Sequence, residues 1–467
     1  MSTAQKFKYR ISVVSAFFLV ALLSLVSCGG GSSGGGTSTG SGTYTVSGAV
    51  SGISVSGLKL TNNGGDEITV NTAGTFAFTA PLANNSAYSV AVSQNPTAPA
   101  QTCTLTNNTG SISSANITNV SVVCSVLTLS IQSISSTGPG QQPSVTFQVK
   151  ANGTPVDIMT APIASLKATI AGPTTDYANY WQATIQGSVI TGTLAPVDAP
   201  NGIFRYTFSA PEAIPVPATG SYVIGLEGYV QDVALVKFSA VSPLLPFIVT
   251  DATPVARRAV VDDAKCNACH ATIAAHKGTR RGVQYCALCH NPNESNDTQV
   301  ARFEGATIVS NSMDMKVLIH KIHRGAALTQ PYIVGGTPAP TTTNPSGTPI
   351  DFRTAVSYPG DLRACKACHL PNTYNIPLAQ GLLPSTEKLF TCTEDPAADT
   401  DSYCITRVVT TSTLTQPIAA ACTSCHDATY TAAHAATMTT SGFIESCPTC
   451  HAVGATNGID VYHKLTP

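Results

Sequence analysis

The chain has 467 residues, of which 43% are hydrophobic and only 10% are charged, and its formal net charge is −1. This composition is typical of an exported, β-rich protein and excludes both a strongly basic nucleic-acid-binding protein and an acidic disordered tail. The length is sufficient for about two to four domains. No nucleic-acid partner is therefore expected.

The N-terminus predicts a secretory signal peptide. Lys6, Lys8 and Arg10 precede a mostly apolar run, ISVVSAFFLVALLSLV, which ends in LVSCGGG. A positive segment followed by a short apolar segment is the pattern of a signal peptide. A transmembrane anchor is the alternative, but a membrane-spanning helix needs a longer apolar run.

The segment that follows the apolar run predicts a lipid anchor. The residues Leu25–Cys28 resemble a bacterial lipobox, in which residues 1–27 are removed and Cys28 carries the lipid. No Asp follows Cys28, which in lipoproteins favours the outer membrane over the inner membrane. Residues 28–43 are rich in Gly and Ser and predict a flexible tether. We therefore expect an outer-membrane lipoprotein, exposed at the cell surface, with the periplasmic face as the alternative.

Residues 44–125 predict a small β-module. The runs YTVSGAV, LKLTNN, EITVNTAGTFAFT, AYSVAVSQ and ITNVSVVC alternate with a period of two and are separated by Asn- and Gly-rich turns, which predicts antiparallel strands. In an exported protein, Cys103 and Cys124 are expected to form a disulfide, with a stabilisation of about 3 kcal/mol. The stretch resembles a β-module found in many bacterial surface lipoproteins, and this resemblance implies no chemistry.

Residues 126–252 predict a second β-domain. Strand-like runs include VLTLSIQSI, PSVTFQVKA, KATIAG, FRYTFS and YVIGLEGYV. About seven short strands at regular spacing favour a sandwich or a small barrel. Trp181 is expected in its core. The region contains no His and no nucleophile–base pair or phosphate-binding loop.

From residue 253 to 467 the pattern changes to short helices and long loops that contain Cys and His together. The clearest helix is NSMDMKVLIHKIHRGA, with Asn311 or Ser312 as its cap and Gly325 at its end. Its apolar residues fall at positions i, i+3, i+4 and i+7, namely Met315, Leu318, Ile319 and Ile322.

Five Cys-x-x-Cys-His motifs lie in this last region. In chain order, motif 1 to motif 5, they are Cys266-Cys269-His270, Cys286-Cys289-His290, Cys365-Cys368-His369, Cys422-Cys425-His426 and Cys447-Cys450-His451. Two thiols three residues apart can bond to the two vinyl groups of one haem, and the adjacent His can bind its iron. Zinc is the alternative ligand, but zinc coordination does not require a His directly after every Cys pair. We therefore expect five covalently bound haems c.

The number of histidines predicts how the irons are ligated. The chain has ten His, and all of them follow residue 265. Five belong to the motifs as proximal ligands. The other five are His276, His320, His323, His434 and His463. Five irons need five distal ligands, so we expect a pair of histidines at every iron and no open coordination position.

The distal histidines differ in their sequence context. His320 and His323 lie three apart on one predicted helix, so they share a face and can ligate two neighbouring irons. His276 and His434 follow a motif by six and eight residues, and each is expected to serve another haem than that of the motif before it. His463 lies near the C-terminus. The sequence leaves open which distal His serves which iron.

Two further cysteines, Cys392 and Cys404, flank the segment TEDPAADTDSY and predict a second disulfide. Neither is followed by His, so a sixth haem is not expected there. Four acidic residues lie in or beside this loop and make calcium a candidate ligand, with a solvated acidic loop as the alternative because the spacing of a known calcium loop is absent. They are Glu394, Asp395, Asp399 and Asp401.

The region that carries the motifs is too short to bury five porphyrins separately. So short a chain lacks the apolar surface for a large core of its own, so the haems are expected to pack against one another and to form the core. The predicted fold is multidomain: N-terminal all-β domains, antiparallel and sandwich- or barrel-like, precede a haem-packed pentahaem domain with short helices and long loops.

These residues also resemble a known family. The stretches CNACHATIAAHKGTRRGVQYCALCHNPNES and MDMKVLIHKIHRG are similar to the pentahaem unit of the OmcA/MtrC family of outer-membrane multihaem cytochromes. The resemblance covers residues 127–467, and by it His276, His320 and His323 resemble distal ligands of the family. It implies a lipid-anchored protein that takes electrons from a porin–cytochrome conduit or another multihaem cytochrome. Such a protein passes the electrons to extracellular metal oxides, flavins or other acceptors.

The chain also departs from this family. Members usually carry two β-domains and two pentahaem domains with ten haems, whereas this sequence has one pentahaem domain and an additional N-terminal β-module. It resembles half a member, so the prediction leaves open whether the protein is the terminal reductase or one link in a longer relay.

Two other functions compete with electron relay. A multihaem reductase of nitrite, sulfite or a similar small oxyanion would need one iron with an open position, and the ten histidines argue against one. Alternatively, the β-modules could serve adhesion or partner docking, with the haems secondary. An enzymatic activity towards extracellular metal oxides remains open.

Overall fold

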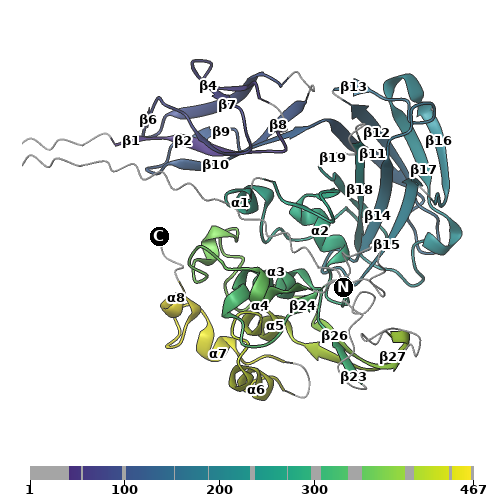
Figure 1. Cartoon of the computed structure of the whole chain (residues 1–467), viewed down its shortest axis with the longest axis vertical. Helices are drawn as coiled ribbons and strands as arrows, with labels where there is room; N and C mark the ends of the chain where they lie inside the picture. Colours follow the sequence, from purple (N-terminus) through teal and green to yellow (C-terminus); the bar gives the residue numbers. More distant parts are fainter. Residues whose placement is uncertain are drawn as a thin grey trace, which may run out of the picture. The chain divides into compact units, whose positions relative to one another are not determined.

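The computed structural model describes residues 42–53, 56–96, 101–151, 153–187, 189–231, 237–270, 272–295, 307–334, 350–394, 404–440 and 444–463 (Figure 1). The predicted signal peptide, Cys28 and nearly all of the tether lie outside these residues. Within the described ranges, we find no helix that is both long enough and apolar enough to cross a membrane.

The first β-module is built from two four-stranded sheets, ordered β5-β2-β10-β8 and β4-β3-β7-β9. The alternation in the sequence places one face of each strand inside: in β7, Tyr88 and Val90 are buried and their neighbours are exposed. Its strands are β1 (Thr43–Tyr44), β2 (Val46–Ser51), β3 (Leu58–Asn62), β4 (Asp66–Val70), β5 (Gly74–Ala77), β6 (Leu82–Ala83), β7 (Ala87–Gln94), β8 (Thr102–Thr106), β9 (Thr109–Ser111) and β10 (Ile117–Ser125).

Two features of this module concern its last strand, β10. The sequence predicts antiparallel pairing, but β10 lies parallel to β2. The two strands are separated by nearly the whole module, and a long connection of this kind permits parallel pairing, whereas a tight hairpin does not. On its other side β10 pairs antiparallel with β8, where Cys124 lies opposite Cys103, and the two are joined by a disulfide.

The second β-domain is a sandwich of two five-stranded sheets. One is ordered β11-β12-β17-β16 with β13 beside β12, and the other is ordered β15-β14-β18-β19 with β20 beside β18. Phe147, Phe204, Tyr206 and Ile224 are fully buried between the sheets, and Trp181 packs, partly buried, against this core. The strands are β11 (Leu127–Ser135), β12 (Ser144–Ala151), β13 (Thr154–Pro155), β14 (Ser165–Gly172), β15 (Asn179–Gln186), β16 (Thr193–Asp198), β17 (Ile203–Thr207), β18 (Ser221–Gln231), β19 (Lys237–Ser239) and β20 (Leu244–Ile248).

Strand β18 is buried on both faces along most of its length. One face, with Ile224, points into the sandwich core, whereas Val223 on the other face packs with Tyr285 of helix α2. Gly225 leaves room for this helix, because a Cβ atom there would lie 2.8 Å from the Tyr285 ring. The Tyr285 hydroxyl also hydrogen-bonds the hydroxyl of Thr169, at 2.8 Å. The burial of both faces of β18 therefore reflects two partners, the sandwich core and α2.

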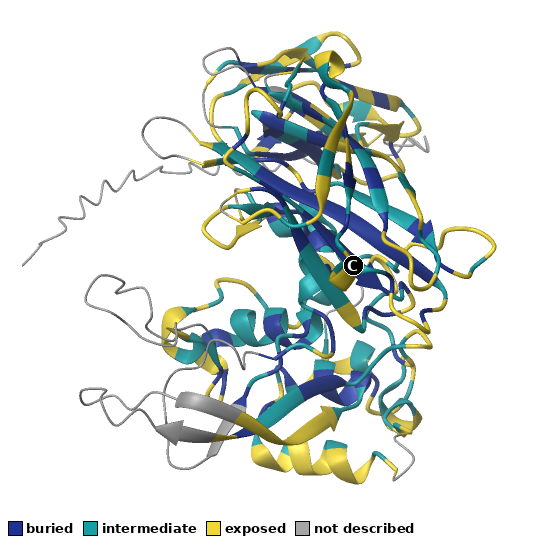
Figure 2. Cartoon of the chain, turned by 90° about the vertical axis from the view of Figure 1, so that its right-hand side faces the viewer, coloured by how far each residue is buried: buried dark blue, intermediate teal, exposed yellow. Residues whose placement is uncertain are grey.

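The C-terminal region combines short helices with small sheets, as expected (Figure 1). Its buried apolar cluster around helix α3 is small and consists of Val317, Leu318, Leu328, Tyr332 and Ala420. Figure 2 shows that buried residues are dense in the sandwich and sparse in the terminal helices. The helices are α1 (Asp263–Asn267), α2 (Val283–Cys289), α3 (Met315–Arg324), α4 (Phe352–Ala355), α5 (Pro417–Thr423), α6 (Thr429–Thr437), α7 (Pro448–His451) and α8 (Ile459–Tyr462).

A long hairpin in this region was not predicted from the sequence. Strands β26 (Ser385–Glu394) and β27 (Cys404–Thr415) pair with each other, and β23 (Thr307–Ser310) adds a third strand. In the backbone register, Cys392 lies opposite Arg407 and Cys404 lies opposite Glu394. The side chains of Cys392, Cys404 and the acidic loop lie outside the described residues. The second disulfide and the calcium site therefore stay predictions.

Helix α3 begins two to three residues later than predicted. Its N-cap is Asp314, whose carboxylate accepts a hydrogen bond from the Lys316 N–H, and not Asn311 or Ser312. A carboxylate at this position satisfies a free N–H group of the first turn and faces the positive end of the helix dipole. Asp314 also accepts a hydrogen bond from the Ser385 hydroxyl, at 2.6 Å, which fixes the start of the helix against β26. The helix ends at Gly325, as predicted.

Candidate haem sites

The five motifs share one local geometry. In each, the N–H of the His donates to the carbonyl of the first Cys, at 2.9–3.0 Å, which closes one helical turn. This turn places both thiols and the imidazole on neighbouring positions of one small loop. The ten motif cysteines form no disulfide and are free to attach a cofactor.

Each motif histidine has one distal histidine beside it. The five pairs of ring centroids are 5.9–6.3 Å apart. In the order of the motifs, the pairs are His270–His323, His290–His276, His369–His320, His426–His463 and His451–His434. The structure thus brings all ten predicted ligands together in five pairs, and no distal histidine lies beside the motif that precedes it in the chain.

The spacing of these rings fits one metal ion between each pair. With a metal–nitrogen bond of about 2 Å and a ring radius of about 1 Å, two imidazoles on opposite sides of one ion have centroids about 6 Å apart. In the described part of the chain, no three His, Cys, Asp or Glu side chains gather as a metal site. A haem iron needs only two protein ligands, because the porphyrin supplies the other four, so paired histidines are the donor set that haem requires.

The ring pairs fall into two orientations. The planes of His276–His290 and His320–His369 are nearly parallel, at 26° and 21°. The other three pairs are closer to perpendicular, at 71°, 81° and 88°. Because two ring planes on one iron orient its d-orbitals, irons held by these pairs would fall into two spectroscopic classes.

Backbone carbonyls orient several of the rings. Nδ1 of His290 contacts the Met313 carbonyl at 3.1 Å, and Nδ1 of His451 contacts the Asn457 carbonyl at 2.9 Å. His323 and His463 make the same contact with the carbonyl four residues earlier, at 2.9 and 3.1 Å. A carbonyl can only accept, so Nδ1 carries the proton, and Nε2 is left as the metal-binding nitrogen.

Burial keeps the ligands in the protonation state that a metal needs. It lowers the pKa of His369 to about 4 and lowers the pKa values of His290 and His426. A neutral imidazole is the form that binds iron. In all three residues burial is the largest cause, because it disfavours the charged imidazolium.

The thiols show which motifs are neighbours in space. Burial raises the pKa of Cys266 in motif 1 to about 12, with smaller contributions from Asp263, from Cys368 in motif 3 and from Cys286 in motif 2. Lys265, beside motif 1, also donates to the Lys366 carbonyl inside motif 3, at 2.8 Å.

The thiols of motifs 3, 4 and 5 also show which of these motifs are neighbours in space. Burial raises the pKa of Cys422 in motif 4 to about 11, and Cys447 in motif 5 and Cys365 in motif 3 add to the shift. The motifs therefore follow one another in the order 2, 1, 3, 4, 5.

Helix α3 connects three of the sites. His320 and His323 reach motif 3 and motif 1, as their spacing on one helix face predicts. Just before the helix, the Met313 carbonyl accepts from the His290 ring of motif 2, and the Met315 N–H donates to the His290 carbonyl, at 3.0 Å. One ten-residue helix thus holds ligands or ligand contacts of motifs 1, 2 and 3.

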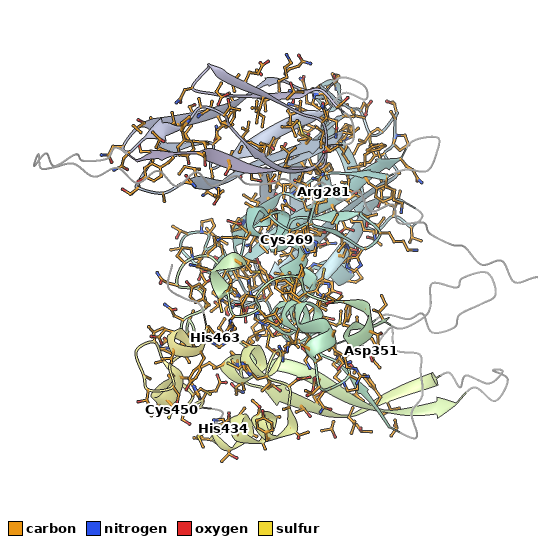
Figure 3. The ribbon with its side chains drawn as sticks, turned by 60° about the vertical axis from the view of Figure 1, so that its left-hand side comes forward. Cys269, Arg281, Asp351, His434, Cys450 and His463 are labelled. Carbon is orange, nitrogen blue, oxygen red and sulfur yellow. A yellow bond between two sulfur atoms is a disulfide. The ribbon has the colours of Figure 1, made fainter. Side chains whose placement is uncertain are left out.

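Several functional contacts were missed at the sequence level. The carbonyl acceptors of Met313 and Asn457 have no sequence signal, because every residue has a carbonyl. Arg281 is buried beside motif 2 and donates to two carbonyls of the β-domains, and no pattern in the sequence indicated this. Figure 3 shows His434 and Cys450 close together at the C-terminal end of the region, in agreement with the ring contact between His434 and His451.

Five Cys-x-x-Cys-His turns, each with a second histidine at ligand distance, define the class of multihaem c-type cytochromes. Residues 258–464 match the family model described as outer membrane cytochrome MtrC/MtrF-like, domains II/IV. Over this region, the chain is similar to the outer membrane cytochromes of the MtrC/MtrF type. No curated protein matches the chain.

Solved structures add little to this assignment. One from Bacteroides uniformis, titled as a candidate carbohydrate-binding protein, is 9% identical, covers 44% of this chain and 99% of its own, and has a TM-score of 0.19. Another is BcpA, the major pilin subunit of Bacillus cereus, at 9% identity, with 44% and 69% of the two chains covered and a TM-score of 0.16. These values carry no statement on fold or function.

Proposed function

We propose that this protein is an outer-membrane lipoprotein that relays electrons through five bis-histidine haems c. The acceptors would be extracellular metal oxides or flavins, or a partner cytochrome. The single observation that supports it most is the five-fold pairing of proximal and distal imidazoles. When bound, haem c supplies reversible one-electron transfer between ferric and ferrous iron.

The residues of this chain would perform three tasks in that relay. The ten motif cysteines hold each porphyrin covalently, so that no cofactor is lost outside the cell. The paired imidazoles would hold each iron and would leave no protein-side position for a small substrate. The order of the motifs would keep the groups that they hold close to one another, which a chain of electron-transfer steps requires.

Motif 2 and motif 5, which lie at the two ends of the row of motifs, differ in their surroundings. At one end, Ala287 and Leu288 inside motif 2, and Tyr285 just before it, are buried with Val223 of the second β-domain. At the other end, Cys450 of motif 5 and its distal histidine His434 are exposed. An exposed terminal site favours exchange of electrons with a large acceptor such as a mineral surface or another cytochrome, whereas a buried site favours internal transfer.

The lipid anchor at Cys28 and a porin–cytochrome conduit as electron donor complete the proposal. The anchor rests on the lipobox sequence, and the conduit rests on the family resemblance. Labelling with a membrane-impermeant reagent on intact cells would distinguish the cell surface from the periplasmic face. Replacing Cys28 with Ala should release the protein from the membrane fraction without changing its haem content.

The experiment that tests the proposal is the low-temperature electron paramagnetic resonance spectrum of the oxidised protein. Five low-spin haems are expected, and by the ring angles they should divide into two with rhombic signals and three with strongly anisotropic signals. A high-spin signal from one haem would contradict the relay and favour the alternative, a reductase of a small oxyanion such as nitrite or sulfite. Stopped-flow oxidation of the reduced protein by ferric oxide, flavin or nitrite would then identify the acceptor.

A further inference from the structure

The loop between motif 1 and motif 2 has an unusual backbone. It runs from Thr272 to Gly282, contains the short strands β21 (Ala274–Ala275) and β22 (Arg280–Arg281), and carries His276 at its turn. His276, Lys277 and Gly278 all have positive φ angles, of 53°, 62° and 77°. Residues with side chains rarely adopt this conformation, so the loop depends on contacts from outside to keep its shape.

The second β-domain supplies some of these contacts. Arg280 donates to the Glu227 carboxylate of β18 at 2.6 Å, in a largely buried ion pair. The Ser239 hydroxyl donates to the carbonyl of Gly278, and Arg281 donates to the Ser239 carbonyl, at 3.2 Å. These contacts hold the β22 side of the loop.

The first β-module supplies the others. The N–H of Gly52 donates to the hydroxyl of Thr272 at 2.7 Å, and Arg281 donates to the carbonyl of Cys124 at 3.4 Å. Arg281 is only 8% exposed, so its guanidinium is fixed between the module and the loop. Gly52 has a φ of 70°, and a Cβ atom there would overlap both the Cys124 carbonyl and the Arg281 guanidinium. The module and the base of the loop are thus packed without space for one methyl group.

We propose that the first β-module, Gly42–Ser125, braces the Thr272–Gly282 loop and thereby keeps His276 beside His290, on the iron of the second haem. This inference rests on the proposed bis-histidine ligation and gives the module a role in it. His276 is the one distal ligand on this loop, and the loop is held on one side by the module. If the contacts between the module and the loop weaken, His276 is the ligand expected to leave its iron, because the other four histidine pairs lie on different elements.

The test is one methyl group placed at Gly52 in the full-length, haem-loaded protein. Gly52→Ala inserts a Cβ between the Cys124 carbonyl and Arg281. Gly64→Ala is the matched control, because Gly64 has nearly the same φ, 71°, but no atom within 4 Å of the added Cβ. Both variants carry the same backbone strain, so a difference between them reports the contact with the loop.

The readouts are the high-spin resonance signal and cyanide binding to the ferric protein, with haem content measured by mass. The wild type and Gly64→Ala should show five low-spin haems and no cyanide binding. In Gly52→Ala, one haem in five should become high-spin or bind cyanide, with all five haems still attached. A wild type that already has an open haem would contradict the proposed function and not the brace itself.

A second variant covers the case in which Gly52→Ala does not fold. Thr272→Val keeps the shape of the side chain but removes the acceptor of the Gly52 N–H. In this variant, the fraction of protein molecules with one high-spin or cyanide-binding haem should rise, but less than in Gly52→Ala. If the variants that fold keep five low-spin haems and bind no cyanide, the module does not brace the ligand loop.

Discussion

Single side chains set the strength of each imidazole as a ligand. Nδ1 of His369 lies 3.4 Å from the Thr373 hydroxyl, which is longer than the contacts of 3.1 and 2.9 Å that His290 and His451 make with carbonyls. The single hydrogen of the Thr373 hydroxyl has two carbonyl acceptors, Leu370 at 2.8 Å and Val260 at 3.0 Å, so the hydroxyl oxygen is available to accept from the imidazole N–H. A hydrogen-bond acceptor on Nδ1 makes the ligand more electron-rich and stabilises ferric iron.

Replacing Thr373 with Val should raise the reduction potential of the haem at motif 3, because His369 loses its acceptor. The hydroxyl's hydrogen bonds to backbone are lost as well, which should lower the free energy of unfolding by about 1 kcal/mol. A redox titration followed by electron paramagnetic resonance measures the first effect. Thr410→Val is the control, because that hydroxyl also donates to a carbonyl, Leu389, but lies on the hairpin. Unchanged midpoints in Thr373→Val would show that the contact does not tune the site.

Acid should destabilise the sites in a defined range. Burial lowers the pKa of His369 from its ordinary value of 6.5 to about 4. Between these two values the unfolded chain binds more protons than the folded one, so stability is complete above pH 6.5 and is lost as the pH falls towards 4. Protonation also competes with iron for the imidazole, in the same direction. A low-spin fraction and an unfolding free energy that stay constant from pH 7 to pH 4 would contradict this prediction.

At the scale of elements, α3 has the greatest influence on the sites, because His320 and His323 serve two of them. The start of this helix depends on Asp314, which caps Lys316 N–H, pairs with the Lys316 ammonium and accepts from Ser385. Asp351 caps α4 in the same way through Arg353 N–H, but α4 carries no histidine. The two helices therefore allow a matched comparison.

Asp314→Ala should cost about 1 kcal/mol for the lost cap, and more because the Lys316 ammonium and the Ser385 hydroxyl lose their partner. Two haems should show a lower melting temperature for their low-spin signal. Asp351→Ala should cost about 1 kcal/mol for the cap without affecting the haem signals. Equal effects of the two substitutions on the haem spectra would mean that the cap of α3 has no special role.

The sequence was informative about elements with strong periodicity and less so elsewhere. The two β-domains and helix α3 follow from alternation and from i, i+3, i+4 spacing. The hairpin of β26 and β27 was missed, because its sequence is broken by the acidic loop and lies between haem motifs. The number of ligands followed from counting histidines. Their pairing did not, because each distal histidine approaches a motif that is remote in sequence or lies across a turn, and only tertiary packing brings them together.

At the scale of the whole molecule, the apolar core is divided unevenly. The module and the sandwich each bury a large cluster of side chains, whereas the described helical region around α3 buries few. Ordinary hydrophobic burial therefore stabilises the N-terminal domains, and under the proposed function the porphyrins would supply the core of the C-terminal region. The proposed domain limits, 44–125, 126–252 and 253–467, separate regions with different sources of stability.

Removing the disulfide between Cys103 and Cys124 tests whether the first β-module and the haem region have separate sources of stability. Replacing both cysteines with Ser should lower the stability of the first β-module by about 3 kcal/mol, because the unfolded chain gains entropy. Thermal unfolding followed by circular dichroism in the β-sheet region measures the loss. The haem content should remain five. Loss of attached haem in this variant would mean that the module is needed for haem attachment, and not only for stability.

Strand β18 has a consequence for how such proteins can be assembled from parts. Its second face presents Val223 and Gly225 to Tyr285 of α2 and pairs Glu227 with Arg280 of the haem region. A chain that ended after the sandwich would leave that face open to water and prone to association. The sandwich and helices α1 and α2 are therefore expected to be inherited together. A recombination event that transfers the haem region to another protein must also transfer β18. The N-terminal module meets the haem loop through polar contacts, so its loss would expose less apolar surface but, by the proposed brace, would release His276.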